Sequence, residues 1–348
     1  MRKIPVALVV ILMLLPTGKT YAATFVVDDG FDYPDANPGD GQALSVYGRT
    51  SLRAAIEEAN ALPGEDTILF SDSLRDARTG FGEVSVYREL VVEDDLIIRT
   101  HNFQILGKIP GHSEERLIRL EGGRQLNIAG VTLGDIDGGC LWIGDSGSLI
   151  ASGCGFVGMA STRGGIVYND GGYVFMTDCG MRGRAQIGGG GVYTCGGTVR
   201  ICNTIFVSYD DGGTALDGCG GVVLSEGGHI ELSHMTLSSC LAGRDGGAIC
   251  SYGGSFRARC IVFSQNNAQG NGGVVCLSSD ASGNMGDVVF ERCAFLDNTA
   301  ANGGAVYVDG GEWDTPPRFI NCVFAGNQAT SGYGGAVMAF DENCTEGK

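Results

Sequence analysis

Gly303-Gly304-Ala305-Val306-Tyr307 is the clearest copy of a phrase in which two glycines precede a short apolar run. Other copies of this phrase begin at Gly138, Gly164, Gly190, Gly220, Gly246, Gly272 and Gly334. Successive copies are separated by 26, 26, 30, 26, 26, 31 and 31 residues. A regular period of this length is typical of a solenoid, whose units are too small to bury a core alone and must stack on their neighbours.

Each repeat contains about three apolar runs of three to six residues, separated by clusters of Gly, Asn and Asp. Arg292-Cys293-Ala294-Phe295-Leu296-Asp297-Asn298 shows one such run, and Val288-Val289-Phe290 lies just before it. None of these runs has the length or the 3.6-residue periodicity of a helix. Three short strands and three turns in each repeat predict one coil of a parallel β-helix, with neighbouring coils about 4.8 Å apart.

The residues between the runs fit the corners of such a coil. Paired glycines supply a positive φ or allow close approach of two backbones. The asparagine that ends each Phe-x-x-Asn phrase tolerates the left-handed conformation, which predicts a left-handed corner at Asn266, Asn298 and Asn327. If these three asparagines stack, their side-chain amides are expected to form a hydrogen-bonded ladder along the axis.

The alternation of Gly-Gly-Ala-[Ile/Val] with Phe-x-x-Asn over residues 138–348 resembles the repeats of the chlamydial polymorphic outer membrane proteins and of related bacterial β-helix proteins. This resemblance implies an all-β fold, a right-handed parallel β-helix, on a protein that is secreted or displayed at the cell surface or outer membrane.

The first residues have the pattern of a signal peptide. Arg2 and Lys3 precede an apolar run from Val6 to Leu15, and small residues follow at Ala22 and Ala23. This pattern predicts a secretory signal peptide over residues 1–22. The apolar run is too short to span a bilayer, and we expect no transmembrane segment after its cleavage.

Residues 23–82 are predicted to form an N-terminal cap region, made of a strand at Thr24–Val27, an acidic loop, a helix at Leu52–Asn60 and a strand at Asp66–Phe70. Ser51 is a suitable N-cap for the helix. The block from Thr50 to Phe70 resembles the Cys-Ser-Leu-Arg-Glu-Ala-Ile motif that precedes many bacterial β-helices, and Thr50 and Ala54 replace its Cys and Glu. The resemblance implies a helix that caps the open end of the stack.

The acidic loop carries five aspartates, at Asp28, Asp29, Asp32, Asp35 and Asp40. Their spacing does not fit an EF-hand. Gly39 occupies a position where an EF-hand has a metal ligand, and the glutamate that ends an EF-hand loop is absent. We expect a solvated loop and assign no cofactor or metal ligand here, with calcium as the alternative.

Residues 83–348 are predicted to form the repeats, about ten coils at the observed period. The earliest coils begin with plainer apolar runs, Val84-Ser85-Val86, Leu90-Val91-Val92 and Leu96-Ile97-Ile98.

The net charge of the chain limits the kinds of molecule that it is expected to bind. The chain has a formal net charge of −17, and removal of Arg2, Lys3 and Lys19 would leave 20 basic against 40 acidic residues. Nucleic acid is therefore an unsuitable partner, because contacts with phosphate need positive charge. A glycan, or a protein on a host or neighbouring cell, is the partner that we expect.

All 13 cysteines lie from Cys140 onward, without the paired spacing of a zinc site. Several recur at the coil period, as Cys250 and Cys276 do. The sequence allows two states for these cysteines, buried thiols stacked in register or disulfides. Directly stacked residues meet the distance requirement of a disulfide but often not its dihedral angle.

Many β-helices are polysaccharide lyases or glycoside hydrolases, so an enzyme is the alternative function. The catalytic phrases of polygalacturonases are absent, the pairs Asp94-Asp95 and Asp210-Asp211 have no companion motif, and His229 and His234 are expected on opposite strand faces. No catalytic residue is assigned. We therefore expect a non-catalytic adhesin or envelope scaffold. An enzyme would need a groove where acidic and basic side chains of three or more coils converge.

Overall fold

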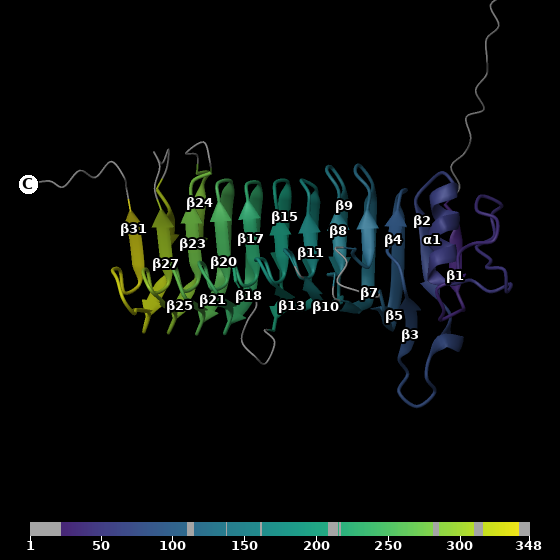
Figure 1. The fold of residues 1–348 in the computed structure, drawn as a ribbon, viewed down its shortest axis with the longest axis horizontal. Helices are drawn as coiled ribbons and strands as arrows, with labels where there is room; N and C mark the ends of the chain where they lie inside the picture. The colour runs from purple at the N-terminus through teal and green to yellow at the C-terminus, as the bar shows by residue number, and fades with distance from the viewer. Residues whose placement is uncertain are drawn as a thin grey trace, which may run out of the picture.

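The computed structural model describes residues 22–340 except 110–114, 137, 161, 208–214, 216, 281–284 and 310–315. It shows an elongated molecule whose strands lie side by side along the long axis (Figure 1). All pairings between its named strands are parallel, which confirms the predicted all-β fold. Among the described residues, no helix has the length and apolar character needed to cross a bilayer. Apart from Ala22, the predicted signal peptide lies outside the described residues.

One sheet contains ten short strands, each paired with the equivalent strand of the next repeat. They are β4 (Leu90–Val92), β6 (Ile118–Leu120), β8 (Leu141–Ile143), β11 (Val167–Asn169), β14 (Val192–Thr194), β17 (Val223–Glu226), β20 (Ile249–Tyr252), β23 (Val275–Ser278), β27 (Val306–Asp309) and β31 (Val337–Phe340).

A second sheet contains seventeen strands, which form two rows of stacked strands, here called ranks. Its longest strands, β5, β7, β18 and β21, belong to both ranks. The first rank is β1 (Thr24–Val27), β2 (Asp66–Phe70), β5 (Leu96–Gly107), β7 (Gln125–Ile136), β9 (Ser148–Ser152), β12 (Tyr173–Thr177), β15 (Thr198–Cys202), β18 (His229–Ser238), β21 (Ser255–Ser264), β24 (Val288–Glu291) and β28 (Arg318–Ile320). The second adds β3 (Gly82–Val86), β10 (Gly155–Ala160), β13 (Gly180–Ala185), β16 (Ile205–Phe206), β25 (Ala294–Leu296) and β29 (Val323–Ala325).

A third, four-stranded sheet lies in the later repeats. It consists of β19 (Leu241–Ala242), β22 (Asn267–Ala268), β26 (Thr299–Ala300) and β30 (Gln328–Ala329).

The core is one continuous apolar cluster that runs through the stack. Strand residues alternate between this core and the outside, so in β6, β8 and β11 the two outer residues are buried and the central one faces outward. Equivalent side chains stack on each other: the ring centroids of Phe263, Phe295 and Phe324 are 4.9 and 4.6 Å apart in succession. Register therefore places chemically similar residues in rows along the axis.

The paired glycines behave as predicted at the corners. The residue with positive φ recurs once in each repeat, at Gly139, Gly164, Gly189, Gly220, Gly246, Gly272, Gly303 and Gly334. In two copies the left-handed glycine is not the one predicted to begin the phrase. It is Gly139 instead of Gly138, and Gly189 instead of Gly190. The second glycine allows close stacking: a Cβ on Gly273 would lie 2.2 Å from the carbonyl oxygen of Gly304.

The asparagine ladder is confirmed, but the predicted left-handed asparagines are wrong. Nδ2 of Asn266 donates to Oδ1 of Asn298 at 3.0 Å, and Nδ2 of Asn298 donates to Oδ1 of Asn327 at 2.8 Å. The positive φ belongs instead to the preceding residues, Gln265 and Asp297. That left-handed residue turns the chain so that the next side chain points inward, where the buried amide satisfies backbone groups of the adjacent repeats.

The predicted helix is α1 (Leu52–Ala61), one residue longer than expected, and η1 (Asp72–Leu74) is a single 3₁₀ turn. The Ser51 side chain accepts from the Ala54 N–H, as an N-cap does. α1 lies at one end of the molecule beside β1, β2 and β4 (Figure 1). The strands predicted at Thr24–Val27 and Asp66–Phe70 are confirmed as β1 and β2.

Candidate functional site

An outward-facing row of large side chains begins on the ten-stranded sheet at β6. Arg119 pairs in register with Trp142 on β8, and Trp142 pairs with Tyr168 on β11. Each is the central residue of a three-residue strand whose outer residues are buried, so all three side chains leave the sheet on its outer face. The guanidinium carbon of Arg119 lies 4.3 Å from the ring centroid of Trp142. The row therefore consists of one arginine followed by two aromatic residues along the axis.

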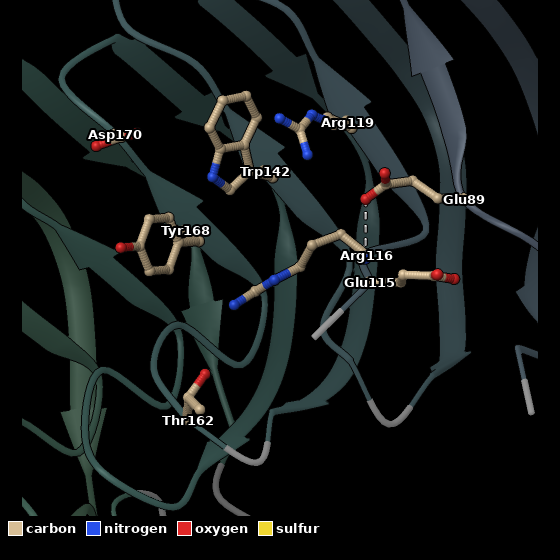
Figure 2. Close-up of a pocket in the computed structure, with 8 residues that line it drawn as sticks. All are labelled: Glu89, Glu115, Arg116, Arg119, Trp142, Thr162, Tyr168 and Asp170. Carbon is tan, nitrogen blue, oxygen red and sulfur yellow. Dashed lines mark hydrogen bonds between the residues drawn. The ribbon is translucent and has the colours of Figure 1, made fainter. Parts of the chain in front are cut away.

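These three side chains line a pocket of about 520 Å³. Figure 2 shows the pocket with acidic side chains near both of its ends. The lining residues come from four successive strands of the sheet and the segments beside them: Glu89, Glu115, Arg116, Arg119, Trp142, Thr162, Tyr168 and Asp170. Acidic, basic and aromatic groups of different repeats thus meet in one concave surface.

Arg116 crosses the floor of the pocket. Its side chain is buried and donates to the carbonyl oxygens of Gly164 and Arg163, the latter at 2.6 Å. Its guanidinium carbon lies 5.5 Å from the ring centroid of Tyr168 (Figure 2). Arg116 therefore links its own segment to the corner before β11 across the floor of the pocket.

Glu89 forms one end of the pocket, where its Oε1 accepts from the backbone N–H of Arg116 at 3.1 Å (Figure 2). The segment before β4 is held from behind by Arg53 of α1, which donates to the carbonyl oxygens of Arg88 and Glu89. Arg53 also forms a buried ion pair with Asp32, with Nε and Oδ1 2.7 Å apart. The helix thus fixes the position of Glu89.

Burial raises the pKa of Glu89, the hydrogen bond from the Arg116 N–H and the charge of Arg119 lower it, and the charges of Glu115 and Glu121 raise it again, with a net upward shift. A carboxyl group of this kind protonates at a higher pH than an ordinary glutamate. Glu115 is exposed and lies beside Glu89 in Figure 2. This end of the pocket therefore offers two carboxyl groups in different environments.

The pocket ends at a polar network beyond Tyr168. The Tyr193 hydroxyl donates to Glu226 at 2.7 Å, and Arg163 forms an ion pair with Glu226 at 3.1 Å while its guanidinium lies 4.9 Å from the Tyr193 ring centroid. Tyr193 is 2% exposed, so the outward row is covered from this point.

A smaller cavity of about 220 Å³ lies on the other side of Glu89. It is bounded by α1 and β4, and its polar lining residues are Arg53, Glu57, Asn60, Glu89 and Glu93. Asn60 fixes its wall, because Nδ2 donates to the Val91 carbonyl at 2.8 Å. The two cavities share Glu89 and together extend from α1 to β11.

In the acidic loop, the carboxylates bind local backbone groups. Asp28 accepts from the Thr50 N–H, Asp29 from Phe31 and Asp40 from Gln42, and Asp35 accepts from Asn37. Asp32 pairs with Arg53. In the parts of the chain that the structure describes, no three His, Cys, Asp or Glu side chains come together as ligands of one metal ion.

The other residues weighed from the sequence lie away from the pocket. Asp94 pairs with Arg124 at 3.1 Å, and Asp95 accepts from the Gln125 N–H. Asp210 and Asp211 lie outside the described residues. His229 and His234 are not on opposite faces as predicted, since neither is buried and a left-handed bend at His234 interrupts the alternation of β18.

Twelve cysteines lie in the described residues, and all are free thiols in the structure. Most are buried and several donate to backbone carbonyls, as Cys154 does to Ser152 at 3.3 Å. Between the two possibilities that the sequence left open, the structure therefore contains stacked thiols.

None of the residues that line the pocket was predicted as a site residue from the sequence. A signal was present: the triplets Ile118-Arg119-Leu120 and Leu141-Trp142-Ile143 each place one large polar or aromatic residue between two aliphatic ones, about one repeat apart. In a short strand that pattern marks the outward position. Stacking these positions in register would have found the row.

No family model matches this chain, and no curated protein or solved structure matches it either.

Proposed function

We propose that this protein is an exported binding scaffold that holds an uncharged glycan in the pocket between Glu89 and Asp170. The observation that carries the proposal is the row Arg119, Trp142 and Tyr168, which places aromatic surfaces between carboxylates. Sugars offer both of the surfaces that such a pocket would bind, C–H faces for aromatic rings and hydroxyl groups for carboxylates and guanidinium groups.

The charge of the pocket favours an uncharged ligand over a polyanion. Glu89, Glu115 and Asp170 outnumber the two arginines. Arg116 is engaged by backbone carbonyls, and Arg119 is bound to Glu121 at 3.0 Å. A sulfated or uronate polymer would meet these carboxylates without a surplus of positive charge.

The scaffold in this proposal is a right-handed parallel β-helix of about ten coils with α1 as its cap. Ten equivalent strands in one sheet, paired repeat to repeat, support the number of coils. Right-handedness follows from the strong general preference of parallel crossovers. The position of α1 at one end, against β1, β2 and β4, supports the capping role. The resemblance to chlamydial polymorphic outer membrane protein repeats supports secretion or display on the cell surface.

The test is a binding screen of the purified protein against soluble neutral, uronate and sulfated oligosaccharides by isothermal titration calorimetry. We expect binding to neutral oligosaccharides and none to the sulfated series. Binding confined to polyanions would overturn the proposal. Binding to cells that persists after enzymatic removal of their glycans would indicate a protein on a host or neighbouring cell as the partner.

The raised pKa of Glu89 favours a second candidate, glycoside hydrolysis. A half-buried carboxyl group suits a general acid, and a second carboxylate nearby would assist water or form the glycosyl intermediate. The pocket also has the convergence of acidic and basic side chains from several repeats that an enzyme needs. Release of reducing ends from a bound oligosaccharide, abolished by Glu89→Gln while binding persists, would establish it. Binding without release would support the scaffold.

A further inference from the structure

A second apolar cluster lies on the outer face of the ten-stranded sheet, separate from the main core. It contains Tyr193, Leu224 and three cysteines, Cys219, Cys250 and Cys276. The three cysteines are 5%, 0% and 5% exposed, although they lie outside the stack of strands. Neither the pocket nor its proposed ligand uses these thiols.

Cys219 and Cys250 reach this cluster from different directions. Cys250 is an outward residue of β20, in register with Leu224 on one side and Cys276 on the other. Cys219 lies at a corner of the preceding repeat, where its neighbours along the axis are Gly188 and Asp245. Cys250 Sγ lies within hydrogen-bonding reach of both Cys219 and Cys276, and the Tyr252 hydroxyl, two residues after Cys250, donates to Cys219 Sγ at 3.4 Å.

We propose that Cys219 and Cys250 form a disulfide that joins two neighbouring repeats when the chain folds under oxidising conditions. The alternative bridge, Cys250 to Cys276, is disfavoured because in-register residues on parallel strands have parallel Cα–Cβ bonds. Such a pair meets the distance requirement of a disulfide but not its Cβ–Sγ–Sγ–Cβ dihedral angle of about 90°. Cys219 is not in register with Cys250, so their Cα–Cβ bonds are not held parallel in this way.

The same geometry separates this pair from the other stacked cysteines. Cys154 and Cys179 occupy equivalent positions in adjacent repeats, just before the in-register residues Gly155 and Gly180. Their thiols donate to the carbonyls of Ser152 and Thr177, two residues earlier in each case. Their sulfur atoms also lie within hydrogen-bonding reach of each other, but at equivalent positions of adjacent repeats their Cα–Cβ bonds are parallel, and they are expected to stay reduced.

The oxidant in this proposal is a small-molecule disulfide or a protein disulfide. One cysteine thiolate attacks it and releases one thiol, and the second cysteine then attacks the mixed disulfide and releases the other. In total two S–H bonds break, one Sγ–Sγ bond forms and the oxidant is reduced to two thiols. The hydrogen bond with Cys250 and burial raise the pKa of Cys219, so the folded thiol is neutral and the bond forms during folding.

In the cell this inference rests on the proposed export, because an oxidising compartment must supply the oxidant. Its test does not depend on export or on glycan binding. The full chain is unfolded and reduced, refolded in oxidised and reduced glutathione, alkylated and digested with trypsin for mass spectrometry. Cleavage after Arg244 and Arg257 separates the peptide with Cys250 from those with Cys219 and Cys276.

We expect one cross-linked peptide pair, with Cys219 and Cys250 as its joined residues, and alkylated Cys154, Cys179 and Cys276. Cys276→Ala should retain the bridge and Cys219→Ala should lose it. A reducing agent should lower the Tm of the wild type and of Cys276→Ala by several degrees, and should leave that of Cys219→Ala unchanged. A bridge between Cys250 and Cys276, or alkylation of all three cysteines in the refolded protein, would overturn the proposal.

Discussion

The side-chain amide of Asn298 donates to Oδ1 of Asn327, the equivalent residue of the next repeat, at 2.8 Å. Oδ1 of Asn298 in turn accepts from both the backbone N–H and the Nδ2 of Asn266. Asn298 is 0% exposed, so it is the central member of a buried chain of amides. Such a chain holds the corners of successive repeats in a single register.

Replacement of Asn298 by Ala should destabilise the protein by about 3 kcal/mol, because it leaves the buried Asn266 N–H without an acceptor. Urea denaturation measures the difference. Asn302→Ala is the matched control, since Asn302 donates a similar bond to Asn271 but is only part-buried, and its loss should cost less than about 1 kcal/mol. Equal losses in the two variants would contradict a special role for the buried ladder.

Gly273→Ala should destabilise the protein by about 3 kcal/mol or more, because the new Cβ would lie 2.2 Å from the Gly304 carbonyl oxygen. Gly227→Ala provides the comparison. Gly227 has a φ of +97° and no atom within 4 Å of its added Cβ, so only the conformational cost of about 1 kcal/mol applies. Thermal unfolding of both variants should rank them in that order. The reverse order would show that the stack relaxes around the second glycine.

Arg53→Met should lower the free energy of unfolding by about 3 kcal/mol, because it leaves the buried Asp32 carboxylate without its charged partner and with only the Tyr87 N–H as a donor. Arg200→Ala removes an exposed ion pair with Glu231 and should change stability by less than about 1 kcal/mol. Chemical denaturation compares them. A small effect at Arg53 would mean that α1 does not fix the segment of Glu89.

The raised pKa of Glu89 predicts a pH-dependent contribution to stability. Between the ordinary glutamate pKa and the raised folded one, the folded state binds more protons than the unfolded state, so this contribution falls as pH rises through that window. Glu89→Gln should therefore have a higher Tm than the wild type at pH 7, and the difference should shrink below about pH 4. A constant Tm difference across this range would contradict the assignment.

Trp142→Ala should weaken binding of the glycan about 30-fold, as expected for the loss of about 2 kcal/mol of apolar contact. Phe175→Ala is the matched control, because Phe175 is an outward aromatic residue of β12 on the other large sheet, away from the pocket. Calorimetry with the oligosaccharide found in the screen measures both. Unchanged affinity in Trp142→Ala would place the ligand elsewhere.

Local patterns predicted the strands and the helix, since apolar runs and the Ser51 cap act over a few residues. Positive φ at Gly303 was likewise predictable from its place in the repeat. The left-handed corner at Asp297 was not, because the sequence shows which residues recur but not which of two neighbours turns the chain. The pocket was missed for a related reason. Glu89 and Asp170 are far apart in sequence, and only the register of β4, β6, β8 and β11 brings them together.

The in-register pairing of Arg119, Trp142 and Tyr168 has a consequence for how such a site changes in evolution. Each repeat advances the row by one strand spacing, about 4.8 Å. Deletion of the whole repeat that carries Trp142 would move Asp170 toward Glu89 by that step and leave every backbone hydrogen bond with a partner. Duplication would lengthen the pocket by the same amount. The size of the ligand would therefore change in fixed increments, close to the length of one sugar unit, without redesign of any strand.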